Sequence, residues 1–189
     1  MNQNIKFNAV IKEMILDYLN IDAYDRIVTN LYSMDLSIKN NDFQKNFNSF
    51  YKVRRDENWR KKYYNYFEKN KKRKDIRFSE ILEAISDSNS VESSFASKML
   101  ATINPEKPIL DKNILNYFGF KIEGLNREKR IKCAIDVYDK IEKEYKKMLK
   151  DNTVKNTIME LKKLLGQYEL SDTKVLDYIL WCKGKKGTK

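Results

Sequence analysis

Apolar residues recur along this chain at intervals of three and four positions, as they do on one face of an α-helix. No segment alternates apolar and polar residues in the manner of a β-strand, and no internal repeat is visible. The pattern predicts an all-α fold, a compact bundle of about nine or ten helices. The helical spacing covers residues 8–20, 22–34, 42–51, 59–67, 78–86, 94–103, 112–120, 127–150, 154–165 and 172–183.

The domain organisation follows from length and composition. A chain of 189 residues can bury a core as one domain, and five glycines with two prolines argue against a fold rich in strands or loops. We therefore expect a single helical domain over residues 1–189. The alternative is two interlocked lobes, in which 1–75 pack with 125–189 and 76–124 form the lobe that carries the site.

Several helix ends are predicted by capping residues. Asp22 and Ser171 are candidate N-caps, because their side chains can accept a hydrogen bond from an amide of the first turn. Gly166 is a candidate for the residue that stops a helix. The glycines and lysines of 184–189 predict a frayed basic tail.

Residues 92–119 carry the least generic pattern in the chain. Lys98 flanks an apolar helical stripe, in line with Ser94 and Thr102 four positions to either side. Ser97 and Ala101 form a flank of small residues that lets another backbone approach closely. The stripe itself consists of Phe95, Ala96, Met99, Leu100 and Ile103.

The helix that bears Lys98 ends at the two prolines of the chain. Pro105 and Pro108 force an extended segment, which leads to Asp111 at the start of the next predicted helix. A lysine on one helix and an acid at the N-terminus of the next would form a compact polar constellation. Lys98 and Asp111 are therefore the two residues that this pattern singles out.

The charge balance indicates which class of binding partner to expect. The formal net charge is +11, with a sequence pI of about 9.4, which favours nucleic acid or another polyanion. An AT-rich genome, which inflates lysine, asparagine, isoleucine and tyrosine, is the alternative explanation. Neither a long apolar run nor a signal peptide is visible in the sequence. We expect a soluble cytoplasmic protein without a membrane partner.

The residue inventory excludes several kinds of chemistry. The chain has no histidine, so catalytic triads and sites built on histidine ligands cannot form. Cys133 and Cys182 stand alone, and the glycines form neither a Walker A loop nor a dinucleotide-binding motif. We expect no metal and no cofactor. Lysine, aspartate, glutamate, tyrosine and serine remain for chemistry.

Residues 51–77 are the most basic and aromatic part of the chain. Aromatic rings stack on bases and cations neutralise phosphates, so this mixture is typical of nucleic-acid surfaces. Helical spacing, however, favours a core role for the aromatic residues, and the arginines at 54 and 55 have Asp56 or Glu57 as alternative partners. The run 69–74 predicts a solvated helix end or loop. The candidate nucleic-acid contacts are Arg54, Arg55, Trp59, Arg60, Lys61 and, from the later helix, Ser94.

Residues 94–118 resemble the part of helix-hairpin-helix DNA glycosylases in which a helix bears the catalytic lysine and an aspartate begins the next helix. Lys98 matches that lysine and Asp111 that aspartate. The wider arrangement is also similar to a family of small bacterial proteins of unassigned activity. It comprises FYKVRR with a following W-R, then SSFASKMLATINPEKPILDKNIL, and a final DYILW.

The first resemblance implies a base-excision DNA glycosylase with lyase activity, which extrudes a nucleotide and attacks its sugar with lysine. The alternative is a non-catalytic module that binds nucleic acid or protein, which the absence of glycine from 86–93 favours. In that case Asp111 is a helix cap, and Lys98 snorkels or forms a buried ion pair with Asp111. Lys174, Asp177 and Trp181 share a helix face, and a packing and ion-pair cluster is favoured over a second half of the site.

Overall fold

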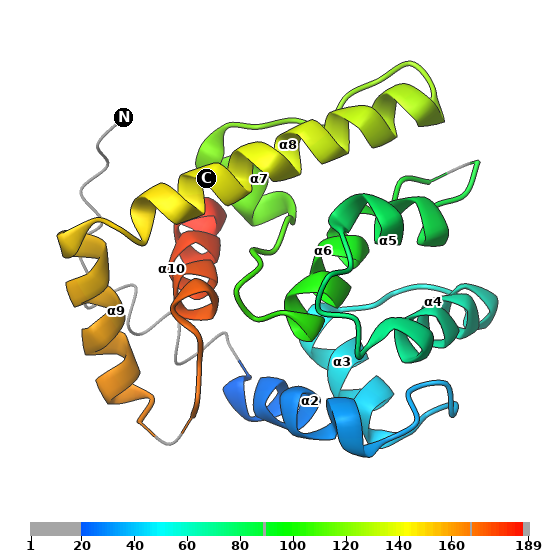
Figure 1. Ribbon diagram of the computed structural model, residues 1–189, viewed down its shortest axis with the longest axis horizontal. Helices are drawn as coiled ribbons and strands as arrows, with labels where there is room; N and C mark the ends of the chain where they lie inside the picture. Colours follow the sequence, from blue (N-terminus) through cyan, green and yellow to red (C-terminus); the bar gives the residue numbers. More distant parts are fainter. Residues whose placement is uncertain (1–19, 89, 167, 187–189) are drawn as a thin grey trace.

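The computed structural model describes residues 20–88, 90–166 and 168–186, which form helices and connecting loops without a strand (Figure 1). The predicted all-α bundle is confirmed, whereas the predicted helix at 8–20 lies almost entirely outside the described residues. None of the helices in the described part is long and apolar enough to cross a membrane. They are α2 (Ile21–Ser33), α3 (Asp42–Tyr51), α4 (Glu57–Asn70), α5 (Phe78–Ile85), α6 (Ser93–Ile103), α7 (Lys112–Phe118), α8 (Arg127–Met148), α9 (Asn152–Leu164) and α10 (Asp172–Lys186).

The helices enclose one core. Helix α10 packs against α7 and α9, α2 packs against α3, and α5 packs against α4, α6 and α8 (Figure 1). Buried apolar residues from each of the nine described helices belong to one contiguous cluster. The long helix α8 runs along one side of the molecule, with α7 and α10 beside it in Figure 1.

Two predicted helix ends need correction. Asp22 is exposed inside α2, and the side chain of Asn20 caps this helix by accepting from the amide of Ala23 at 3.0 Å. The predicted frayed tail is also wrong in part, because α10 continues past Gly184 to Lys186. By contrast, the predicted cap Ser171 is confirmed, since its Oγ accepts from the amide of Lys174 at 3.0 Å.

The aromatic residues of the basic stretch mainly build the core. Tyr63 and Phe67 of the predicted helix at 59–67 are fully buried, and Tyr64 joins them from the same helix. Tyr63 donates a hydrogen bond to the carbonyl of Phe95 at 3.0 Å, which ties α4 to α6. Trp59 packs against the core while remaining partly exposed.

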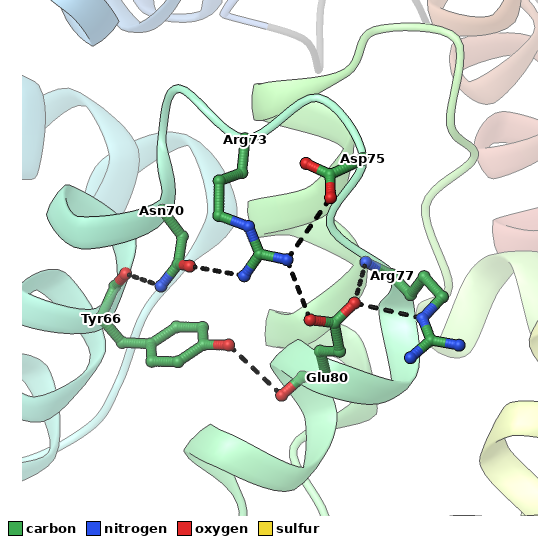
Figure 2. A network of polar contacts seen from close by, with 6 residues as sticks. All are labelled: Tyr66, Asn70, Arg73, Asp75, Arg77 and Glu80. Atoms are coloured by element: carbon green, nitrogen blue, oxygen red, sulfur yellow. Dashed lines mark hydrogen bonds and ion pairs between the residues drawn. The ribbon is translucent and has the colours of Figure 1, made fainter.

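The basic run at 69–74 forms the predicted solvated end of α4 and the loop after it, where all of its cations except Lys71 are exposed. Lys71 is buried, donates to the carbonyl of Met34 at 2.7 Å and pairs with Glu68 at 2.9 Å. Arg73 bridges the end of α4 to the start of α5 through Glu80 at 3.1 Å (Figure 2). Lys71 and Arg73 thus also stabilise contacts between helices, through partners that the local sequence pattern does not indicate.

Candidate functional site

Lys98 lies on α6 with its amine withdrawn from water. Its Nζ is 3.4 Å from the backbone carbonyl oxygen of Tyr51. The amine also lies 5.1 Å from the ring centre of Phe95 and 5.5 Å from that of Tyr51. Burial lowers the pKa of Lys98 below its usual value, and the negative charge of Asp111 offsets part of this effect. A lysine in this environment is neutral in a larger fraction of molecules than a solvated one.

Asp111 is the N-cap of α7. Its Oδ1 accepts hydrogen bonds from the amides of Asn113 at 2.9 Å and Ile114 at 3.0 Å. The capping role that the sequence offered for this residue is therefore present. No direct ion pair joins Asp111 to Lys98, so the two groups interact through the electrostatic field.

The extended segment before Asp111 is fixed to the helix that bears Lys98. Ser97 of α6 is fully buried, and its Oγ accepts from the amide of Leu110 at 2.9 Å. A serine at this position is small enough to let the backbone of residue 110 approach the helix. The predicted small-residue flank thus positions Asp111 relative to α6.

Asp111 also lines an open pocket of about 420 Å³. Ser94 lines the same pocket from the first turn of α6, and Lys112 and Lys121 bring positive charge to it. Lys98 is not among the lining residues. The structure therefore brings Ser94 and Asp111 to one concave surface and leaves the amine of Lys98 behind it, against Tyr51 and Phe95.

Lys174 of α10 adds a second buried cation near this pair. Its Nζ lies within 4.2 to 5.5 Å of four ring centres and 3.5 Å from the hydroxyl of Tyr51. Its pKa is lowered to about 8, mainly by burial. The charges of Asp177 and Asp111 oppose this decrease, and the charge of Lys98 contributes to it. The four rings belong to Tyr24, Phe50, Tyr51 and Tyr178.

Asp177 is the buried acid of the same centre. Its Oδ1 accepts from the hydroxyl of Tyr145 at 2.7 Å and from the amide of Ile109 at 3.2 Å, while its buried Oδ2 has no hydrogen-bond partner. Burial raises the pKa of Asp177 to about 7. Because Ile109 lies in the segment that leads to Asp111, this acid also holds the segment in place.

The packing role predicted for the face of Lys174 and Asp177 is present, whereas the predicted ion pair does not form between these two residues. This face also adjoins the candidate site. The sequence suggested this face from its helical spacing but did not suggest its link to Lys98. Lys98 and its partner Tyr51 lie 47 positions apart, and Lys174 and Tyr51 lie 123 apart. No local pattern reports contacts over such separations.

Two of the predicted nucleic-acid contacts, Arg55 and Trp59, lie beside Phe95. Arg55 forms an ion pair with the buried carboxylate of Glu92 at 2.5 Å and not with Asp56 or Glu57. Its guanidinium lies 5.8 Å from the ring centre of Trp59, whose ring lies 4.9 Å from that of Phe95. Arg55 and Trp59 are thus brought close to Lys98 through the ring of Phe95.

The other predicted contacts are surface cations. Arg54 and Lys61 are exposed, Arg60 is partly exposed, and none of their side chains makes a hydrogen bond or ion pair with another described residue. Arg60 and Lys61 lie in the first turns of α4, where their charges lower the pKa of Glu57 after its stronger partner Lys39. None of these three side chains lines the pocket at Asp111.

Comparison with models of protein families, curated proteins and solved structures gave no match. The resemblance to helix-hairpin-helix glycosylases therefore stays a prediction from residues 94–118. The fold and the site define an all-α protein in which the buried pair Lys174 and Asp177 lies near the partly exposed Lys98 and Asp111, and Asp111 lines an open pocket.

Proposed function

We propose that the protein binds DNA and acts on it as a base-excision glycosylase with lyase activity. Lys98 is the nucleophile and Asp111 the stabilising carboxylate. One observation carries the proposal: a lysine withdrawn from water is electrostatically coupled to an aspartate that lines an open pocket. The volume of this pocket, about 420 Å³, falls in the range of about 300 to 1,000 Å³ found for small-molecule sites.

The lysine can act only when its amine is neutral. Burial of Lys98 lowers its pKa and so favours the neutral form. For the attack, the amine turns from Tyr51 and Phe95 toward the pocket at Asp111. It then attacks C1′ of an extruded nucleotide, while the bond from C1′ to the base breaks and its electron pair leaves with the base. The base takes the proton that the amine releases. Opening of the sugar at O4′, which takes a proton from water, yields a protonated imine between Lys98 and C1′.

Asp111 can stabilise the positive charge that develops on the sugar. Both of its backbone hydrogen bonds end on Oδ1, so Oδ2 has no hydrogen bond to a described residue. A fixed carboxylate stabilises the positive charge that forms at C1′ as the base departs. The helix cap therefore holds the residue in one orientation while its second oxygen stays available.

The test is covalent trapping with borohydride. The protein is incubated with duplexes that carry oxidised, alkylated, deaminated or abasic nucleotides, and the imine is reduced to a stable adduct. We expect an adduct with the wild type, none with Lys98→Met, and a strong decrease with Asp111→Asn. Asparagine is as good an N-cap as aspartate, so this variant removes the charge while it keeps the helix.

The matched control is Lys155→Met, which removes an exposed lysine of α9 that does not line the pocket at Asp111 and should leave trapping unchanged. Circular dichroism confirms that each variant is folded. If no duplex gives an adduct, or if the adduct persists in Lys98→Met, the catalytic assignment is wrong.

A non-catalytic nucleic-acid-binding module is the second candidate. The contacts of the Lys98 amine with Tyr51 and Phe95, and its absence from the pocket lining, favour this role. The module should bind undamaged duplexes with a clear salt dependence, because phosphate contacts release counterions. In that case folded Lys98→Met binds DNA as the wild type does, and no duplex is cleaved.

A further inference from the structure

A second open pocket lies between α8 and the turn that follows α7, with a volume of about 420 Å³. The lining residues of α8 recur at intervals of three and four, so they lie on one face of the helix. The lining includes four lysines and one carboxylate, that of Asp136. The four lysines are Lys121, Lys129, Lys132 and Lys140, and we call this hollow the lysine pocket.

The turn after α7 is held against α8 by specific contacts. Gly119 ends α7 with a φ of 69°, a left-handed conformation that glycine adopts readily. The chain then passes Cys133 of α8, whose thiol lies 3.7 Å from the carbonyl oxygen of Lys121 and 3.4 Å from the amide of Glu123. These contacts place Lys121 opposite the lysines of α8.

The four lysines are free to attract an anion. All four are exposed, and none of them forms an ion pair with a described residue. In contrast, two cations of the basic run at 69–74 form ion pairs, Lys71 with Glu68 and Arg73 with Glu80. Like charges that converge on a concave surface raise its local potential, and an anion relieves their repulsion.

The lysine pocket adjoins the pocket at Asp111. Phe120 and Lys121 line both of them, so the two hollows meet at this turn. A ligand with regularly spaced negative charges can therefore occupy the lysine pocket while a neighbouring unit enters the pocket at Asp111. Nucleic acid has this form, since phosphates alternate with the sugars and bases.

We propose that the lysine pocket binds the phosphodiester backbone of the DNA strand whose nucleotide enters the pocket at Asp111. This proposal rests on the proposed function, which it deepens by assigning a backbone-binding surface that the sequence did not predict. Lysine contacts a phosphate as a compact point charge, so the surface gives affinity without reading the base sequence.

The test uses two double variants with the same change in charge. Lys132→Gln with Lys140→Gln removes two lysines from the pocket, and Lys155→Gln with Lys163→Gln removes two exposed lysines from α9. The probe is a fluorescent 16-base-pair duplex with a tetrahydrofuran abasic analogue, titrated at several salt concentrations. We expect the slope of log K against log salt to fall by about 2 for the pocket variant, roughly 0.9 for each lost phosphate contact.

The α9 variant should keep both the affinity and the slope of the wild type. Suppose that the wild type binds the duplex and that the pocket variant has the same affinity and salt slope as the wild type or the α9 variant. In that case the inference is wrong while the proposed function stands. If the wild type does not bind DNA at any salt concentration, both proposals fail. Binding to anionic lipid vesicles through these lysines, without binding to DNA, would likewise refute both.

Discussion

Lys174 and Asp177 lie one turn apart in α10 and are both buried, yet no direct ion pair joins them. The ammonium lies 4.2 Å from the ring centre of Tyr24 and the carboxylate accepts from Tyr145 at 2.7 Å. Aromatic faces attract a cation and hydrogen bonds stabilise an anion, so each group has its own compensation for the loss of water. The remaining cost of burial makes this pair sensitive to pH.

The first prediction is a decrease in stability between pH 4 and pH 7 that depends on Asp177. Its pKa is raised from 3.8 to about 7 by burial, so in this window the folded state keeps a proton that the unfolded state has released. A rising pH therefore favours the unfolded state. The difference in free energy of unfolding between the wild type and Asp177→Asn should fall across this window, as measured by urea denaturation.

Lys174 has the opposite effect at higher pH, where it makes stability rise with pH. Burial lowers its pKa from 10.5 to about 8, so between these values the unfolded state holds the extra proton and stability rises with pH. Lys174→Met serves as the control, because it should remove the rise above pH 8 and keep the decrease below pH 7. A difference between the wild type and Asp177→Asn that is flat from pH 4 to pH 7 would contradict the assignment of Asp177.

The second prediction concerns the hydroxyl of Tyr145. Tyr145→Phe removes the donor at 2.7 Å from Oδ1 of Asp177 and leaves that carboxylate with only the amide of Ile109. We expect a loss of about 1 to 3 kcal/mol at pH 8, where the carboxylate is charged, and a smaller loss at pH 5. Thermal or urea unfolding at the two pH values measures the difference.

Tyr138→Phe is the matched control. Tyr138 is equally buried, but its hydroxyl donates to the neutral carbonyl of Pro108 at 3.1 Å. Its removal should cost about 1 kcal/mol at both pH values, because no titrating partner is involved. Equal pH dependence in the two variants would show that the effect at Tyr145 does not depend on Asp177.

Helical periodicity was sufficient to predict most of this fold. The order of Lys98, two prolines and Asp111 predicted a helix, an extended segment and an N-cap, and the structure has all three. Each of these features is determined by residues a few positions apart. The partners of the Lys98 amine were not predictable, because Tyr51 reaches it through the packing of α3 against the rest of the core.

Charges in a sequence also do not indicate their partners. Lys74 lies in a run that predicts a solvated surface, yet its amine donates to the carbonyl of Ile103 at 2.8 Å. Conversely, Lys132 and Lys140 follow the ordinary pattern of an amphipathic helix, although the turn at Lys121 makes them part of a pocket. Only the tertiary arrangement separates cations that hold the fold from those that face a ligand.

The third prediction separates the two neighbouring arginines. The side chain of Arg55 is 39% exposed, and it pairs with Glu92, whose side chain is only 3% exposed. Arg55→Ala leaves this carboxylate without its cation, so we expect a loss of about 1 to 2 kcal/mol in the free energy of unfolding. Arg54 is exposed, and Arg54→Ala should change stability by less than about 0.5 kcal/mol.

DNA affinity gives the complementary measurement. Under the proposed function, Arg54→Ala weakens binding several-fold at low salt, because the loss of a phosphate contact reduces counterion release. Its stability serves as the internal control for folding. If Arg55→Ala is as stable as the wild type, the ion pair with Glu92 does not contribute to the fold in the way described here.

The last prediction concerns the contact between α10 and α7. A Cβ atom at Gly184 would lie 1.8 Å from the carbonyl oxygen of Asn113, and this neighbour is backbone that cannot rotate away. Gly184→Ala should therefore push the two helices apart and cost about 3 kcal/mol, even though alanine favours the helix by about 1 kcal/mol. Because Asn113 donates its amide to Asp111, the displacement should also reduce borohydride trapping.

Gly166→Ala is the matched control. Its Cβ would meet only the carbonyl oxygen of Lys163, at an ordinary 3.4 Å, and we expect a change within about 0.5 kcal/mol. Urea denaturation compares the two variants directly. Equal stability of Gly184→Ala and the wild type would mean that α7 is free to move relative to α10. Asp111 would then not be held in a fixed position, and the electrostatic stabilisation proposed for it would lose its structural basis.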